Sequence, residues 1–110
     1  MYEYKARCIR VIDGDTAELD IDAGLYVHVH ETCRLFGLNA PEMKLDTRPA
    51  GEAAKAYLAS LIDGAELIVQ TLHDKRCKYG RFLVVIWKDG VNVNEAMVQA
   101  GHAVLYGEGM

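Results

Sequence analysis

The chain has 110 residues, the length of one domain, so a second folded unit is not expected. Hydrophobic residues make up 51% and charged residues 25% of the sequence, which excludes disordered, collagen-like and low-complexity proteins. The formal net charge is −4, from 12 Lys and Arg against 16 Asp and Glu. Taken alone, this charge argues against a protein that coats nucleic acid, because non-specific binding depends on neutralising phosphates.

The cysteines and the first residues predict a cytoplasmic protein with reduced thiols. No apolar run approaches the ~18 residues of a membrane span. The start, MYEYKARC, lacks the basic and then apolar pattern of a secretory leader, so secretion would require a leader that has been removed. Neither a disulfide framework nor a zinc site is expected from the irregular spacing of Cys8, Cys33 and Cys77.

The first third of the chain alternates with a period of two, which predicts an antiparallel meander of three strands. The first strand ends at the turn dipeptide Asp13-Gly14, and the second covers residues 16–21. After a turn at residues 22–24, a long extended segment is expected over residues 25–38.

Two histidines lie two residues apart in this extended segment, where alternate residues share a face. His28 and His30 could together bind a transition metal, but no third ligand is apparent in the sequence. We therefore expect both side chains to face solvent.

Apolar residues spaced by three and four predict a helix that begins near Pro49 and ends at Ile62. Gly64 ends it, because glycine can take the left-handed cap conformation. Two strands are expected at residues 67–72 and 81–87. Asn94 is predicted to be the N-cap of a short helix over residues 95–100, and residues 102–106 are expected to be extended.

Five strands with a helix between the third and the fourth have the element order of the OB-fold, a five-stranded Greek-key β-barrel. The predicted fold is therefore mainly β with α (α+β), with two helices, in a single domain over residues 1–110. The sequence shows no internal repeat and no linker.

Three motifs contain candidate chemistry, and the densest is VIDGDT at residues 11–16, followed by Asp20 and Asp22. Carboxylates on both sides of a glycine in a hairpin can converge on a hard cation, since Ca²⁺ and Mg²⁺ prefer oxygen ligands. The alternative interpretation is a polar turn without a ligand. The motif is not an EF-hand, because no Glu closes a twelve-residue loop.

The other two motifs combine basic residues with an acid or an aromatic ring. RLFGLNAPEMK at residues 34–44 places Arg34 in a strand and Glu42 after the rigid turn residue Pro41. An arginine within a barrel strand must be paired or face a cleft. KYGR at residues 78–81 offers charge for phosphates and a ring for stacking on a base. A surface ion pair and a solvated turn are the alternatives.

The strings VIDGDT, RLFGLNAPE, GEAAKAYL, KYGR and NEAMVQAGHAVLY, in this order, resemble the staphylococcal (thermo)nuclease family over residues 10–106. The resemblance implies an OB barrel with helices. It also implies Ca²⁺-dependent hydrolysis of phosphodiester bonds in DNA and RNA, with 3′-phosphate products. Sequence specificity should be slight, because nothing resembles a base-reading helix.

Carried over by position, the resemblance implies a catalytic trio of Arg34, Glu42 and Arg81. Glu42 is the candidate general base, and the two arginines would stabilise the phosphorane-like transition state. Lys78 and Tyr79 match the positions that grip a terminal phosphate of the nucleotide.

The resemblance also implies a metal site. Its expected ligands are Asp15, Asn39 and the backbone carbonyl of Ala40, and Asp13 and Thr16 lie beside the metal. The family pattern commonly has a second acid where Asn39 stands. We therefore expect Ca²⁺ to bind more weakly, or the metal preference to change.

The end of the chain departs from the family pattern. Only residues 107–110 follow the last predicted strand, so the C-terminal third helix of the family is expected to be absent. The apolar surface that this helix would cover is then reshaped, solvated or covered by another subunit, which makes a homodimer a hypothesis. No membrane partner is expected.

Two alternatives to a nuclease come from other functional classes. A non-catalytic OB module of the same ancestry would hold nucleic acid or a protein ligand, but it would not need Arg34, Glu42 and Arg81 together. An assembly or toxin-like effector domain would act through protein contacts. Degradation of DNA by the purified chain separates these alternatives from an enzyme.

The net charge is concentrated in one segment. Residues 13–22 hold five acids and no base, whereas the other hundred residues hold 12 bases and 11 acids. The overall acidity therefore reflects the candidate metal site rather than an aversion to phosphate. It still predicts weak, salt-sensitive binding of nucleic acid.

Overall fold

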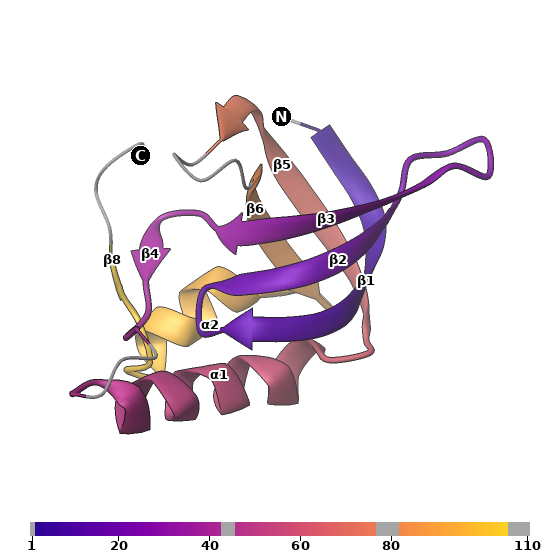
Figure 1. Cartoon of the computed structure of the whole chain (residues 1–110). Helices are drawn as coiled ribbons and strands as arrows, with labels where there is room; N and C mark the ends of the chain where they lie inside the picture. Colours follow the sequence, from indigo (N-terminus) through magenta and orange to yellow (C-terminus); the bar gives the residue numbers. More distant parts are fainter. Residues whose placement is uncertain (1, 43–45, 77–81, 106–110) are drawn as a thin grey trace.

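The computed structural model describes residues 2–42, 46–76 and 82–105, except for the side chains of residues 73–76. Its elements (Figure 1) are β1 (Tyr2–Asp13), β2 (Thr16–Asp22), β3 (His28–Leu35), β4 (Leu38–Asn39), α1 (Arg48–Ile62), β5 (Glu66–Arg76), β6 (Phe82–Lys88), β7 (Val91–Asn92), α2 (Val93–Gln99) and β8 (Val104–Leu105). No helix in the described ranges is long and apolar enough to cross a membrane.

Five of the strands form a closed barrel. The sheet has the order β3-β2-β1-β5-β6-β7, and parallel pairing of β3 with β6, from Cys33–Phe82 to Leu35–Val84, closes it. Figure 1 shows α1 lying across one end of the barrel. The predicted α+β OB-fold with two helices is therefore confirmed.

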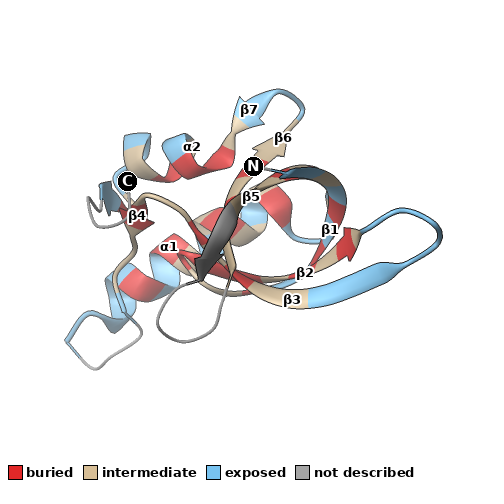
Figure 2. Ribbon diagram, turned by 90° about the horizontal axis from the view of Figure 1, so that it is seen from above, coloured by how far each residue is buried: buried red, intermediate tan, exposed pale blue. Residues whose placement is uncertain are grey.

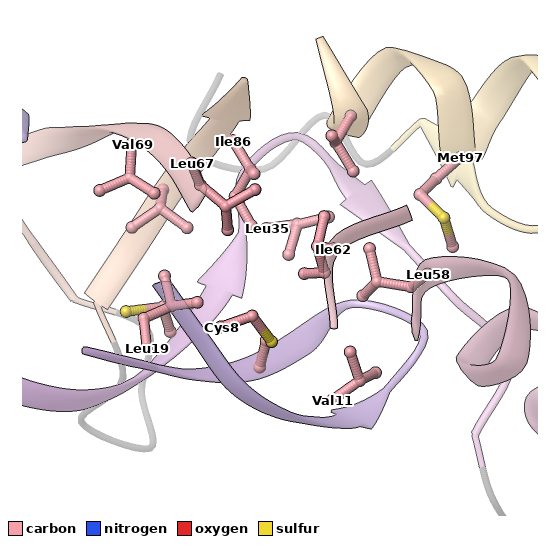
Figure 3. Packing of buried hydrophobic residues seen from close by; sticks show 14 of the residues in the cluster. Cys8, Val11, Leu19, Leu35, Leu58, Ile62, Leu67, Val69, Ile86 and Met97 are labelled. Atoms are coloured by element: carbon pink, nitrogen blue, oxygen red, sulfur yellow. The ribbon is translucent and has the colours of Figure 1, made fainter. Parts of the chain in front are cut away.

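The hydrophobic core fills the barrel and extends to α1. The buried residues of α1 are Gly51, Ala54, Leu58 and Ile62. Their spacing of three and four places them on one face of the helix. In Figure 3, Leu58 and Ile62 point into the same cluster as Leu35 of β3 and Met97 of α2. Burial of a Leu or Ile side chain contributes about 1.5–3 kcal/mol, so this stripe holds α1 against the barrel.

Cys8 and Cys33 are free and buried in this core. Burial raises the pKa of Cys8 to about 11 and the pKa of Cys33 to about 12. Both thiols therefore stay protonated and unreactive at neutral pH. The third cysteine, Cys77, lies outside the described residues.

The start of α2 corrects one prediction. The helix begins at Val93, and its N-cap is Asn92, whose side-chain oxygen accepts a hydrogen bond from the Glu95 N–H at 3.1 Å. Asn94, which was the predicted cap, lies inside the helix and is buried. Asparagine is favoured at N-caps. Because Asn92 and Asn94 are only two residues apart, the sequence alone did not determine which of them caps the helix.

The buried Asn94 side chain connects three parts of the fold. Its Oδ1 accepts a hydrogen bond from the N–H of Ile86 at 3.1 Å. Its Nδ2 donates to the carbonyls of Phe36 and Val84 at 3.0 and 3.1 Å. One amide therefore joins α2 to β6 and to the turn between β3 and β4.

The extended segment predicted over residues 25–38 is shorter in the structure. It is divided into β3 and the two-residue strand β4, and β3 begins only at His28. Before it, Leu25 and Tyr26 have φ angles of 55° and 63°, and the Val27 N–H donates to the Gly24 carbonyl at 2.9 Å. Two central residues with positive φ are the requirement of a type I′ turn, which usually has the sequence Asn-Gly.

The β2–β3 hairpin projects from the barrel (Figures 1 and 2), and its end, residues 20–30, is called the hairpin arm here. On the β2 side of this arm, Asp20–Asp22 still pair with β1. Its tip is apolar, and Leu25 and Tyr26 are 94% and 102% exposed. The left-handed tip residues were not expected, because the sequence has neither Asn nor Gly at the two central positions.

Replacing Leu25 by Asn together with Tyr26 by Gly is expected to stabilise the protein. Bulky residues in the left-handed region cost roughly 1–2 kcal/mol each, and neither exposed side chain contributes burial. We expect the free energy of unfolding, measured in urea, to rise by about 1 kcal/mol once the greater freedom of glycine in the unfolded chain is included. The control with alanine at both positions should show no such gain. A lower urea midpoint for the Asn-Gly variant would contradict this account of the turn.

Candidate active site

The β1–β2 turn and the end of β3 bring the first site residues together. Asp15 Oδ2 lies 2.9 Å from Arg34 Nη1, and the two side chains are 12% and 13% exposed. Thr16 is the register partner of Arg34, and the Leu35 N–H donates to the Asp15 carbonyl at 2.8 Å. Because main-chain pairing fixes both backbones, this ion pair is part of the barrel framework.

Arg34 is also connected to the turn that follows β3. Its Nη2 donates to the Leu38 carbonyl at 3.1 Å and to Oδ1 of Asn39. The Ala40 N–H donates to Asp15 Oδ2 at 3.0 Å. The predicted residues Asp15, Arg34, Asn39 and Ala40 therefore form one connected group. The sequence contained no signal that the arginine would bridge the two predicted metal ligands.

The two carboxylates of the turn have opposite pKa shifts. Burial, together with the hydrogen bond and the charge of Asp15, raises the pKa of Asp13 to about 6. Burial also acts to raise the pKa of Asp15, but hydrogen bonds from Asp13, Ala40 and Thr16 and the charge of Arg34 outweigh it and lower that pKa. Asp15 is therefore ionised at neutral pH, whereas Asp13 exchanges its proton in the mildly acidic range.

Replacing Asp13 by Asn is expected to stabilise the metal-free protein at neutral pH. Burial raises the folded-state pKa of Asp13 from 3.8 to about 6. Protonated Asp13 therefore contributes its full stabilisation below pH 3.8, and this contribution is lost as the pH rises through about 6. Asn cannot ionise, and its Oδ1 can still accept the Asp15 N–H, which is 3.2 Å from Asp13 Oδ1. We expect a gain of about 1 kcal/mol near pH 8 in chelator, allowing for solvent screening, that shrinks towards pH 4. Urea unfolding of both proteins between pH 4 and pH 8 measures this gain. A difference in free energy of unfolding that does not change with pH would contradict the prediction.

Gly14, between the two acids, makes a close contact that the sequence did not reveal. A Cβ at this position would lie 2.6 Å from Ala54 Cβ of α1 and 2.7 Å from Ala40 Cβ. Both distances are too short for real Cβ contacts, so the position requires glycine unless its neighbours move. The sequence indicates only a turn residue at Gly14, because Ala54, the helix residue that it contacts, is 40 residues further along the chain.

The other predicted catalytic residues are described only in part. Glu42 is exposed, and its backbone carbonyl accepts a hydrogen bond from Thr47 Oγ1 at 2.6 Å. Phe82, at the start of β6, pairs with Cys33, the neighbour of Arg34. Three predicted site residues lie outside the described residues: Lys78, Tyr79 and Arg81.

The chain is similar in sequence to a known protein family. A family model described as staphylococcal nuclease homologue matches residues 32–109. Two curated relatives named "Uncharacterized endonuclease", from Escherichia coli and E. coli O157:H7, are each 38% identical over 101 residues, which cover 91% of this chain and 60% of the relative. Endonuclease YncB of Bacillus subtilis (strain 168) is 32% identical over 98 residues, or 86% of this chain and 44% of that relative. The chain thus spans 60% or less of the length of these relatives.

Proposed function

The chain belongs to the staphylococcal nuclease family, and from that premise we propose that it is a nuclease that hydrolyses phosphodiester bonds in DNA and RNA with little sequence specificity. The observation that supports this most directly is the fixed position of Arg34. Its guanidinium contacts Asp15, Leu38 and Asn39, while Glu42, in the same turn segment, is exposed.

Arg34 is assigned to the oxygens of the scissile phosphate. A guanidinium is always charged, and its planar fork of donors matches phosphate oxygens in pairs. Because the protein holds Arg34 in place through three contacts, negative charge that develops in the transition state would meet a positioned donor without reorganisation. Arg81 is assigned a second such role, and Lys78 and Tyr79 the terminal phosphate, from the family resemblance.

Glu42 is assigned the role of general base. Its exposed carboxylate can accept a proton from water as the new oxygen–phosphorus bond forms and the bond to the leaving oxygen breaks. Proton transfer of this kind contributes about 10²–10⁴-fold to a rate. The leaving oxygen takes up a proton, and the 3′ side keeps the phosphate.

Ca²⁺ is the proposed cofactor, with Asp15, Asn39 and the Ala40 carbonyl as ligands and Asp13 and Thr16 beside them. The donors are all oxygens, which a hard cation prefers, and Asp15 Oδ2 and Asn39 Oδ1 both contact Arg34 in this structure. When bound, the ion would supply positive charge to the phosphate oxygens. In the described part of the chain, no group of three His, Cys, Asp or Glu side chains is arranged to hold a metal ion.

Replacing Asn39 by Asp is expected to lower the Ca²⁺ concentration needed for half-maximal activity. A second carboxylate beside Asp15 adds attraction for the cation, on the order of 10-fold in affinity. Titration of activity with Ca²⁺ measures the change. Asn92→Asp is the control. It makes the same chemical change at the N-cap of α2, where aspartate is also favoured, and it should not alter the Ca²⁺ requirement. An unchanged or higher requirement for N39D would show that Asn39 is not a ligand.

The proposed function is tested by incubating linear duplex DNA, single-stranded DNA and RNA with the purified chain in Ca²⁺, Mg²⁺ or chelator. We expect metal-dependent degradation that Glu42→Gln lowers by about 10²–10⁴-fold. Glu52→Gln is the matched control, because Glu52 is an exposed acid on α1 that pairs with Arg48 at 3.1 Å. Equal degradation by Glu42→Gln and wild type would refute the assigned mechanism.

A non-catalytic OB module is the second candidate. One observation favours it: the contacts of Arg34 with Asp15, Leu38 and Asn39 stabilise the turn whether or not a phosphate is present. Such a module would bind single-stranded nucleic acid or a protein ligand without cutting. Binding of DNA with no degradation under any metal would support the module and exclude the nuclease.

A further inference from the structure

The hairpin arm gathers four potential metal ligands on one face. In the β2–β3 ladder, Asp20 is opposite His30 and Asp22 is opposite His28. Residues that face each other in an antiparallel ladder share a side of the sheet, and so do residues two apart on one strand. The exposed positions expected for the histidines are confirmed, but the missing third ligand is now supplied by the neighbouring strand.

The distances within this group match those between metal ligands. Asp20 Oδ1 lies 3.0 Å from His28 Nδ1 and 3.5 Å from His30 Nε2. Tetrahedral ligands at typical zinc–nitrogen and zinc–oxygen bond lengths lie about 3.4 Å apart. The carboxylate oxygen is therefore at ligand spacing from His30 Nε2, and its 3.0 Å hydrogen bond with His28 Nδ1 would lengthen by about 0.4 Å on metal binding.

The side chains are free to complete this arrangement. Both rings now approach the same oxygen, and no three such side chains among the described residues surround a common point. The side chains of His28 and His30 are 53% and 64% exposed, so small rotations of the rings would disturb no packing. A cation placed between the rings and Asp20 would replace the two contacts that now run to this oxygen.

We propose that Asp20, His28 and His30 bind one divalent transition-metal ion of the Zn²⁺ type on the hairpin arm. Imidazole nitrogens favour Zn²⁺, Ni²⁺ and Cu²⁺, whereas Ca²⁺ and Mg²⁺ favour oxygen ligands alone. The site is separate from the candidate active site, because Asp20 is the fifth residue of β2, which begins directly after Asp15, and five residues of strand span about 16 Å.

Such a site would join β3 to β2 where β3 has no second neighbouring strand in the described structure, whereas β2 pairs with β1 as far as Asp22. In the described part of the chain, β3 pairs with β6 only from Cys33 onward, so His28–Thr32 pairs with β2 alone. A metal held by one ligand from β2 and two from β3 would act as a cross-strand clamp. We expect it to stabilise the arm without taking part in hydrolysis.

Zn²⁺ titration calorimetry on the full chain tests the proposal. The Cys77→Ser background removes the thiol outside the described residues, and millimolar Ca²⁺ throughout occupies the candidate active site. We expect one Zn²⁺ per chain, with affinity lowered at least about 10-fold in each of the variants His28→Gln, His30→Gln and Asp20→Asn. His73→Gln and His102→Gln are the matched controls and should bind as the background does.

The ring proton signals of the four histidines provide a second measurement. Zn²⁺ should shift the signals of His28 and His30 and leave those of the other two histidines unchanged. It should also raise the thermal unfolding midpoint of the Cys77→Ser protein, but not that of the same protein with His30→Gln. Absence of Zn²⁺ binding would overturn the proposal. So would undiminished binding by both His28→Gln and His30→Gln, or loss of binding in His73→Gln or His102→Gln.

Discussion

Replacing Arg34 by Met is expected to destabilise the protein by about 3 kcal/mol and to lower its nuclease activity at least about 10²-fold. The variant removes the partner of a buried carboxylate, since the Asp15 side chain is only 12% exposed. The same change deletes the hydrogen bonds to Leu38 and Asn39 that hold the turn. Urea unfolding gives the stability change, and degradation of DNA at saturating Ca²⁺ gives the activity change.

The matched control for Arg34 is Arg48→Met. Arg48 pairs with Glu52 at 3.1 Å, but both side chains are 56% exposed, so this change should cost at most about 0.5 kcal/mol and leave activity intact. Arg34→Lys separates the two roles of Arg34, because a single ammonium keeps a charge beside Asp15 but cannot reproduce the fork of donors. It should recover part of the stability and little of the activity. If Arg34→Met and Arg48→Met had similar effects, the Asp15–Arg34 pair would not be part of the framework.

Replacing Asn94 by Leu is expected to cost at least about 2 kcal/mol in free energy of unfolding. Leucine has the branching of the amide but leaves the Ile86 N–H and the Phe36 carbonyl without this partner, whereas the Val84 carbonyl still accepts the Phe36 N–H at 2.8 Å. Each buried polar group that loses its hydrogen bond costs about 1–3 kcal/mol. The expected result is a large decrease in the urea concentration at the unfolding midpoint. The slope of the free energy of unfolding against urea concentration should stay unchanged, provided that unfolding remains two-state.

Asn92→Ala provides the comparison within the same helix. It removes one N-cap hydrogen bond, to the Glu95 N–H, and should cost about 1 kcal/mol. The order of the two effects is the discriminating result. If Asn92→Ala cost more than Asn94→Leu, the structural role assigned to the hydrogen bonds of Asn94 would be refuted.

Local patterns predicted most of the barrel because they depend on neighbouring residues. The turn at Asp13-Gly14 and the polar–apolar alternation located β1 and β2, and the spacing of apolar residues located α1. The start of β3 was predicted three residues early, since the apolar Leu25 and Tyr26 suit a strand by residue type, although both have positive φ. Propensity alone cannot identify a turn that is built from unfavourable residues.

The candidate site was predictable only as a set of separate residues. Motifs identified Asp15, Arg34 and Asn39, but their connection through one guanidinium depends on where β3 ends relative to the β1–β2 turn. The contact of Gly14 with Ala54 depends on the path of a helix that is distant in the sequence. Asp20 was assigned to the acidic motif near the turn, whereas the strand register places it against His30. Register between strands is a long-range property that one-dimensional patterns do not contain.

The parallel pairing that closes the barrel has a consequence for folding. Cys33 and Phe82 meet across a sequence separation of 49 residues, so the entropy of closing this long loop is lost before the contact is made. Folds dominated by such non-local pairs fold slowly, typically in milliseconds to seconds. Arg34 is part of this pairing with Leu83. The β1–β2 turn can form early from local contacts, but the surroundings of Arg34 are completed only when the barrel closes. A newly made chain would therefore complete its candidate active site in the last stage of folding.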